Sequence, residues 1–238
     1  MIRSRLLCAA IPYLLGVVGC IPDGAPMTGA AAASSPEGKA CPADGVIDDA
    51  EDDNNQVAPN KGRSGYWYTF ADKKGSSVTP AAGGTFAMSK GGASGSAHSA
   101  HVSGKVGGAE VVYAGMGFNF VEPKGPYNAG AYKGISFWAK VGEGSATKVR
   151  LKVPDINTDG DGKVCTECYN DFGADLELST TWTKYTVPFS TMAQLPGWGA
   201  PHPPAVDTTK LFGVQWQVNA PGASYDVWVD DVAFTGCP

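Results

Sequence analysis

The stretch TKVRLKVPD, residues 147–155, alternates strictly between apolar and basic side chains. Because successive side chains of a β-strand point to opposite faces of its sheet, this alternation predicts a strand with one buried face. The other face meets water or a ligand. The apolar positions are Val149, Leu151 and Val153, and the basic positions are Arg150 and Lys152.

Comparable stretches recur along the chain, each short, rich in aromatic or β-branched residues, and bounded by Gly, Pro, Asn or Ser. Leu176 and Leu178, for example, alternate with Asp175 and Glu177. Such segments are typical of strands joined by turns, and their spacing predicts an all-β fold, an antiparallel β-sandwich of the jelly-roll type. The stretches are GYWYTFAD (65–72), SAHSAHVSG (96–104), VYAGMGFNF (112–120), GISFWAKV (134–141), TKVRLKVPD (147–155), ADLELSTTW (174–182), TKYTVPF (183–189), LFGVQWQVN (211–219) and YDVWVDDVAF (225–234).

Composition supports this fold class and limits the partners. The 238 residues include 32 Gly and 17 Pro, as expected for a chain of strands and turns. The net charge is −5 and Lys and Arg do not cluster, which argues against nucleic acid as a partner.

The first residues have the layout of a bacterial secretory signal. MIRSR is cationic, and the apolar run after it is too short to span a membrane comfortably. Val17-Val18-Gly19-Cys20 resembles a lipobox, which predicts a lipoprotein signal peptide over residues 1–19 and a diacylglyceryl group on Cys20. The alternative is an ordinary signal peptide that contains a cysteine.

The rest of the chain divides into a tether and one domain. Residues 20–40 are rich in Ala, Gly, Ser and Pro and predict a flexible, lipid-anchored tether, and residues 41–238 have the size of one domain. We therefore expect an exported protein of the bacterial cell envelope, held at the outer membrane or cell surface. The lipid anchor would be its contact with the membrane.

Four cysteines fall within the expected domain. Cys41 and Cys237 lie at its two ends, where a disulfide would join the first and last strands. Cys165 and Cys168 would then pair locally. A redox pair or half of a zinc site is the alternative for the second pair, but no βαβ pattern surrounds it.

The order of these motifs resembles the galactose-binding-like jelly rolls of carbohydrate-binding modules. Family 11 is the most similar, with family 30 and the related domain of complex I intermediate-associated proteins as further relatives. The resemblance covers nearly all of residues 44–237 and implies non-catalytic binding of β-glucan along a concave, tyrosine-lined sheet face. Its motifs are VIDDAEDDNNQ, GYWYTFAD, GISFWAK, VRLKVPD, CTECYNDFGADLELSTTWTKYTVPF, GWG, LFGVQWQV and YDVWVDDVAF.

Candidate binding residues follow from the chemistry of sugars. Sugar rings pack their C–H groups on aromatic rings, while their hydroxyls need amide or charged partners. Aromatic and polar side chains opposite the apolar face of a strand, or in loops, are therefore the candidates. They are Tyr66, Trp67, Tyr68, His101, Arg150, Tyr169, Trp198, Gln215 and Gln217.

Simpler roles are open for several aromatic and basic residues. Trp198 could anchor a Pro-rich loop, and Arg150 could pair with a carboxylate. The remaining tryptophans within or beside the strands are expected in the packed core. These are Trp138, Trp182, Trp216 and Trp228.

The acidic stretch at the domain start is a candidate calcium site. The related jelly rolls hold a structural Ca²⁺ between the first and last strands, which by position implies Glu51 and Asp230 as ligands and Asp49 and Asp231 as near alternatives. Crowded carboxylates are costly unless a cation neutralises them. A solvated acidic edge explains the same residues.

A second acidic stretch, DINTDGDGKVCTE, partly matches an EF-hand loop. Lys163 and Thr166 stand where later ligands are needed, and no helices flank the stretch, so a glycine-rich turn is the alternative. The candidate ligands are Asp155, Asn157, Asp159 and Asp161.

Two further functions remain open. An envelope scaffold could use the same fold to bind a protein partner. A glycoside hydrolase would need two carboxylates facing each other across a cleft. Glu110, Asp175 and Glu177 are available, but no metal-protease or nucleophile-elbow motif is present in the sequence.

Overall fold

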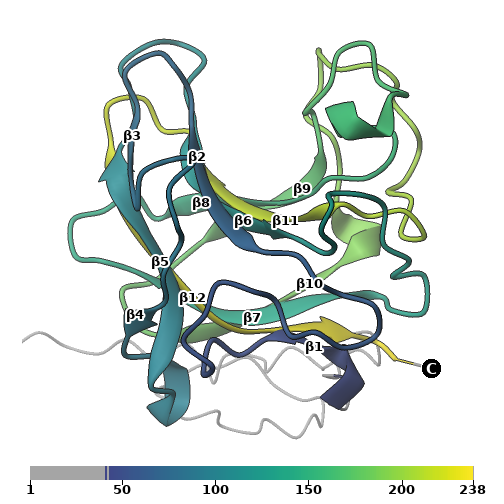
Figure 1. Cartoon of the computed structure of the whole chain (residues 1–238). Helices are drawn as coiled ribbons and strands as arrows, with labels where there is room; N and C mark the ends of the chain where they lie inside the picture. The colour runs from purple at the N-terminus through teal and green to yellow at the C-terminus, as the bar shows by residue number, and fades with distance from the viewer. Residues whose placement is uncertain (1–40, 42, 238) are drawn as a thin grey trace, which may run out of the picture. The chain divides into compact units, whose positions relative to one another are not determined.

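The computed structural model describes residue 41 and residues 43–237, which form two antiparallel β-sheets packed face to face (Figure 1). This arrangement confirms the predicted all-β sandwich. The expected signal peptide, the lipid on Cys20 and the tether all fall in residues 1–40, outside the described residues. In the part that the structure describes, no helix has the length and apolar character needed to cross a membrane.

One layer is a five-stranded sheet in the order β2-β6-β11-β8-β9, with all neighbours antiparallel. It curves upward at both sides in Figure 1. Its strands are β2 (Trp67–Ala71), β6 (Ala114–Asn119), β8 (Lys148–Val153), β9 (Phe172–Glu177) and β11 (Gly213–Val218).

The other layer is a seven-stranded sheet built on the path β10-β7-β12-β5-β3, with β1 beside β12 and β4 beside β5. Its strands are β1 (Val46–Asp48), β3 (Ser77–Thr79), β4 (Ser89–Lys90), β5 (His98–Lys105), β7 (Gly134–Val141), β10 (Thr183–Pro188) and β12 (Ser224–Thr235). Within residues 43–237, four short 3-10 helices lie in the connections: η2 (Ala43–Gly45), η3 (Ala93–Gly95), η4 (Gly160–Gly162) and η5 (Phe189–Thr191).

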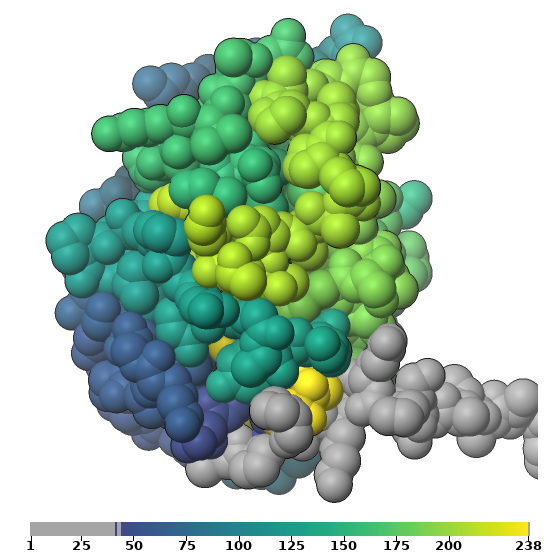
Figure 2. Space-filling model, turned by 90° about the vertical axis from the view of Figure 1, so that its right-hand side faces the viewer, coloured from purple at the N-terminus to yellow at the C-terminus, as the bar shows by residue number. Residues whose placement is uncertain are grey.

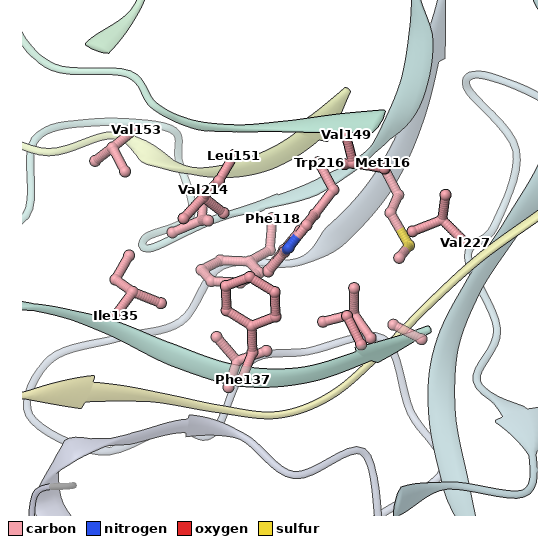
Figure 3. Close-up of a cluster of buried hydrophobic side chains, with 14 of the residues drawn as sticks. Met116, Phe118, Ile135, Phe137, Val149, Leu151, Val153, Val214, Trp216 and Val227 are labelled. Carbon is pink, nitrogen blue, oxygen red and sulfur yellow. The ribbon is translucent and has the colours of Figure 1, made fainter. Parts of the chain in front are cut away.

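Aliphatic and aromatic side chains fill the space between the sheets (Figure 3). Trp216 of β11 is 1% exposed and packs edge-on against Phe137 of β7, with ring centroids 5.2 Å apart. Trp67 of β2 stacks on Trp216 at 5.7 Å. The expectation that Trp216 belongs to the core is confirmed, and Trp67 belongs there too.

The other three tryptophans are not core residues, so that expectation is wrong. Trp138 and Trp228 occupy outward positions of β7 and β12, because their neighbours in sequence point inward, and Trp182 lies just before β10. The Lys140 ammonium lies 5.0 Å from the Trp182 ring and 5.1 Å from the Trp228 ring. These tryptophans form a half-buried patch on the outer face of the seven-stranded sheet.

The two ends of the domain meet beside this sheet. Cys41 and Cys237 are joined with their Cα atoms 5.6 Å apart, and the Cys41 backbone N–H donates to the Phe234 carbonyl. Arg63 is 2% exposed, and its guanidinium donates to the Val46 carbonyl and the Tyr127 hydroxyl. The disulfide and the Cys41 hydrogen bond thus tie the start of the domain to its last strand, and Arg63 ties β1 to Tyr127.

Replacing Trp216 by alanine should lower the free energy of unfolding by about 3–5 kcal/mol, because it opens a large cavity in the core. Trp182→Ala is the matched control and should cost about 1 kcal/mol or less, because that indole is partly exposed and contacts Lys140. Urea unfolding measures both. Equal losses would contradict the assignment of the two tryptophans to core and surface.

Candidate functional site

A groove of about 910 Å³ runs over the outer face of the five-stranded sheet. Loops rise on both sides of this sheet in Figure 1 and form the walls of the groove. The floor comes from β2, β8 and β11, one wall from residues 110–113, and the other from residues 168–171 together with Leu195 and Trp198.

Two glycines lie beneath the side chains at the centre of the floor. Gly115 and Gly117 occupy the outward positions of β6, while Met116 and Phe118 between and beside them are fully buried in the core. A Cβ atom on Gly117 would lie 2.5 Å from the Val214 carbonyl oxygen, so no larger residue fits without displacement. The strand therefore gives its side chains to the core and leaves a trough on the groove side, which the side chains of β2 and β11 cover.

Aromatic rings from β2 lie over this trough. Tyr68 and Phe70 pair across the sheet with Gly117 and Gly115, and the Phe70 ring would lie 3.0 Å from a Cβ on Gly115. The Tyr68 and Phe70 ring centroids are 6.2 Å apart, and Tyr113 continues the run 6.3 Å beyond Phe70. Three aromatic rings thus follow one another from the floor to the wall.

Amides face these rings from the other side of the trough. Gln215 and Gln217 occupy outward positions of β11, opposite Gly117 and Gly115. The Gln215 amide donates to the Tyr68 hydroxyl at 2.9 Å across the glycine strand. Burial raises the pKa of Tyr68 to about 12, so its phenol is neutral at physiological pH.

Three basic side chains line the groove, and each is paired. Arg150 donates to Asp175 at 2.9 Å and to the Ala193 carbonyl. Lys152 lies 2.8 Å from the Asp171 carboxylate. The third, Lys124, binds Asp159 at 2.7 Å and Asp161 at 3.0 Å, and these hydrogen bonds oppose the effect of burial and raise the pKa of Lys124.

Two loops, residues 155–171 and 194–201, form what we call the aromatic wall. Tyr169 is 61% exposed and Trp198 is 44% exposed, and both line the groove. The loops pair through an antiparallel bridge between Glu167 and Ala200. Figure 2 shows the outside of the wall, where the green surface of the first loop lies against the yellow-green surface of the second. Cys165 and Cys168 are joined within the first loop.

The structure brings most of the predicted binding residues together. Six of the nine line the groove: Tyr68, Arg150, Tyr169, Trp198, Gln215 and Gln217. Tyr66 is 40% exposed but lies outside the groove lining. Phe70, which follows Tyr68 by two positions, and Tyr113 also line the groove and were not among the predicted residues.

The prediction that Trp67 contributes to the binding face is wrong. Its side chain is 3% exposed, because it alternates with Tyr68 and therefore points into the sandwich. The indole Nε1 donates to the Asp48 carboxylate at 2.5 Å.

His101 does not line the groove, because β5 belongs to the seven-stranded sheet. Its imidazole stacks on Trp228 with ring centroids 3.8 Å apart. The Nε2 atom lies 2.9 Å from Asp226 Oδ1, which also accepts a hydrogen bond from the Trp228 indole. Burial lowers the pKa of His101 despite the neighbouring carboxylate.

The carboxylates of the EF-hand-like stretch bind backbone N–H groups and a lysine of the protein itself. Asp155 is fully buried and accepts hydrogen bonds from the backbone N–H groups of Asn157 and Asp207. Asp159 caps η4 by accepting from the Asp161 N–H and also binds Lys124. These contacts match the glycine-rich turn that the sequence left open.

The first acidic cluster surrounds the loop that carries η3. Glu51 Oε1 accepts hydrogen bonds from the Ser96 hydroxyl and from the N–H groups of Ala97 and His98. These bonds, with the His98 N–H contributing most, lower the pKa of Glu51.

Asp230 and Asp231 lie on the last strand, on the other side of this loop. Asp230 is 1% exposed and accepts from the N–H groups of Ala93 and Asp231, yet burial raises its pKa to about 6. Burial and then the charge of Asp49 raise the pKa of Asp231. Within residues 41 and 43–237, no three His, Cys, Asp or Glu side chains converge into a metal-binding group.

The carboxylates considered for hydrolysis are engaged by neighbours or separated. Asp175 and Glu177 lie two positions apart on β9, where Asp175 binds Arg150 and Glu177 accepts from the Thr147 hydroxyl. Glu110 lies in the lining of the groove. Asp175 and Glu177 thus share one strand and do not face each other across a cleft.

Comparisons with known proteins support the fold. No family model matches the chain, and a comparison with curated proteins gives no match. The family 11 carbohydrate-binding module of the cellulosomal cellulase Lic26A-Cel5E of Clostridium thermocellum is 16% identical, with a TM-score of 0.54 over 81% of this chain and 94% of that one.

Two further solved structures are similar. The family 11 module from Clostridium thermocellum in complex with a β-1,3-1,4-mixed-linked tetrasaccharide is 18% identical, with a TM-score of 0.52 over 72% of this chain and 89% of that one. A family 30 carbohydrate-binding module is 9% identical, with a TM-score of 0.50 over 77% and 94%. The expected jelly-roll fold of these modules is therefore confirmed.

Gly117→Ala should lower the free energy of unfolding by about 1–3 kcal/mol, because the new methyl group meets the Val214 carbonyl oxygen of β11 and the Gln215 side chain. Gly108→Ala is the control, because no atom lies within 4 Å of a Cβ there, and its effect should stay within about 0.5 kcal/mol. Urea unfolding of both variants distinguishes a required glycine from a tolerated one.

Proposed function

We propose that the domain binds an uncharged polysaccharide in the groove without catalysis, and that the ligand is a β-glucan. The run of three aromatic rings, Tyr68, Phe70 and Tyr113, is the observation that carries the proposal. Sugar rings present flat C–H faces, and successive rings of a glycan could pack on successive aromatic rings. A groove is also the shape that an extended chain needs.

The polar side chains of the floor complement the rest of a sugar. Hydroxyl groups at the ring edges need hydrogen-bond partners, and Gln215 and Gln217 can both donate and accept. Gln217 Oε1 already accepts from Lys152 at 3.3 Å, which leaves its NH₂ group for a ligand. Apolar contacts with rings and polar contacts with amides together are typical of sugar sites.

The charges of the groove favour an uncharged ligand. Arg150, Lys124 and Lys152 are each neutralised by a carboxylate within 3.0 Å. A polyanionic glycan would have to displace these carboxylates or leave its own charge unpaired, and both are costly. The tetrasaccharide of the similar family 11 module, which is β-1,3-1,4-mixed-linked, is the basis for choosing β-glucan as the first ligand to test.

Phe70→Ala and Tyr113→Ala should each weaken glucan binding at least tenfold, which corresponds to about 1.4 kcal/mol. Tyr66→Ala is the matched control and should bind as the wild type does, because Tyr66 is 40% exposed, as Tyr113 is, but lies outside the groove lining. Affinity electrophoresis in mixed-linked β-glucan, with thermal melts to confirm folding, measures the effect.

Failure of the wild type to bind any glucan, xylan or mannan on a glycan array would overturn the proposal. A protein partner is the second candidate, because Val111 is 63% exposed at the rim of the same groove. Pull-down from envelope extract, with and without added polysaccharide, separates the two functions. The hydrolase alternative predicts release of reducing sugar that is lost in Asp175→Ala or Glu177→Ala.

We also propose that the protein is exported and lipid-anchored at Cys20, as the VVGC sequence indicates. Growth with labelled palmitate should label the wild type and not Cys20→Ser. Equal labelling of both proteins would exclude this anchor.

Calcium at the first acidic cluster is a further proposal. Asp230 is buried without a salt-bridge partner among the described residues. Burial raises the pKa of Asp231, and the charges of Asp49 and Glu51 lie near enough to raise it further. Ca²⁺ would supply the missing positive charge and prefers such oxygen ligands. It would have to draw Glu51 and Asp230 away from the N–H groups of residues 93–98 that they now accept.

Removal of calcium should therefore lower the melting temperature. At free Ca²⁺ one hundred times the dissociation constant, binding to the folded state alone adds about 2.7 kcal/mol. Chelation with EGTA should remove that stability in the wild type, and Glu51→Gln should show a much smaller response. An unchanged wild-type melt would assign the cluster to a solvated acidic edge.

A further inference from the structure

Lys152 has an unusual position for a basic residue in a groove. It lies near the end of β8 in the floor, next to the aromatic wall, and its side chain is 9% exposed. Its ammonium meets three acceptors: Asp171 Oδ2 at 2.8 Å, the Tyr169 carbonyl oxygen at 3.2 Å and Gln217 Oε1 at 3.3 Å.

These contacts use the full donor capacity of the side chain. An ammonium group has three protons, and each has one of the three acceptors. A ligand hydroxyl could receive a proton from Lys152 only by displacing one of them. The geometry is therefore that of a residue that holds other groups in place.

Tyr169 is the part of the wall that Lys152 holds. Its φ is +75°, a left-handed conformation that is uncommon for a bulky residue. Its N–H donates to the Thr158 carbonyl at 2.7 Å and its carbonyl accepts from Lys152, so the residue is fixed from both sides. Such backbone persists only where surrounding contacts determine it, and it presents the ring to the groove.

The next residue, Asn170, links Tyr169 to the second loop of the aromatic wall, residues 194–201. The Asn170 amide donates to the carbonyls of Leu195 and Trp198, and its oxygen accepts from the Leu195 N–H at 2.9 Å. Gly199, beside Trp198, has a φ of +88° and donates to Glu167 at 3.1 Å. Tyr169 and Trp198 therefore stand on one hydrogen-bonded unit whose contact with the floor includes Lys152.

We propose that Lys152 is a positioning residue for sugar binding, which acts by holding Tyr169, and through Asn170 also Trp198, ready to stack on the ligand. The inference rests on the proposed function. Its physical basis is preorganisation. If the wall is ordered before the ligand binds, the entropic cost of ordering the wall does not reduce the free energy of binding. Arg150, two residues earlier on the same face, lacks this link and binds Asp175 and the Ala193 carbonyl.

A double-mutant cycle tests the route through Tyr169. Lys152→Met should weaken binding of mixed-linked β-glucan about tenfold in the wild-type background and by less than about twofold in a Tyr169→Ala background. Equal losses in both backgrounds would mean that Lys152 acts on the ligand directly or through Gln217, and would overturn the proposed route through Tyr169. Because Lys152→Met leaves Asp171 charged and buried, the cycle is repeated with Lys152→Met/Asp171→Asn, which removes that charge.

A ligand-free measurement separates this inference from the proposed function. Amide hydrogen exchange over residues 165–171 should become at least tenfold faster in Lys152→Met, while Arg150→Met, the matched control, should leave it unchanged. Unchanged exchange in Lys152→Met would overturn the inference whatever the protein binds. If no glycan binds the wild type but the exchange result is as expected, the proposed function fails and the positioning of the wall by Lys152 remains.

Discussion

The groove depends on a steric constraint at β6, where Gly115 and Gly117 alternate with the buried Met116. Any larger side chain at Gly117 would meet the backbone of β11 at 2.5 Å. Because the groove side of this strand is empty, the aromatic rings of β2 can lie across it, and Tyr68 can reach Gln215 on the far side. The same strand thus gives its side chains to the core and leaves its groove side to the side chains of β2 and β11, which form the floor.

Strand alternation predicts which face a side chain occupies, and it identified much of the floor. Arg150, Gln215 and Gln217 oppose apolar neighbours and do line the groove. The same rule, applied strictly, separates Trp67 from Tyr68 and selects Phe70, since residues two apart share a face. In AGMGFN, glycines alternate with Met116 and Phe118, and this pattern also indicates a strand face without side chains. Alternation does not show which of the two sheets a strand joins. His101 lies on the outer face of the seven-stranded sheet, away from the groove.

The wall was beyond sequence reasoning for a different reason. Its residues are positioned by contacts between distant segments, such as Asn170 with Leu195 and Glu167 with Gly199. Neither periodicity nor composition reports such pairs, because each loop read alone resembles a polar turn. Tyr169 and Trp198 were selectable as exposed aromatics, but their shared support was not. In the acidic loop after β8, the sequence matches part of a metal-binding motif, but Asp155 accepts hydrogen bonds from backbone N–H groups of its own chain.

The outer face of the seven-stranded sheet also carries aromatic residues, but they are arranged differently. Lys140 lies between the rings of Trp182 and Trp228, and His101 stacks on Trp228 from the other side. The Trp228 ring is thus occupied by the protein's own side chains, and Trp182 and Trp138 each contact a lysine, Lys140 and Lys184. The proposed ligand would be held from one side of the sandwich, which makes the domain monovalent. Such a domain would coat a polysaccharide chain without cross-linking it to a neighbour.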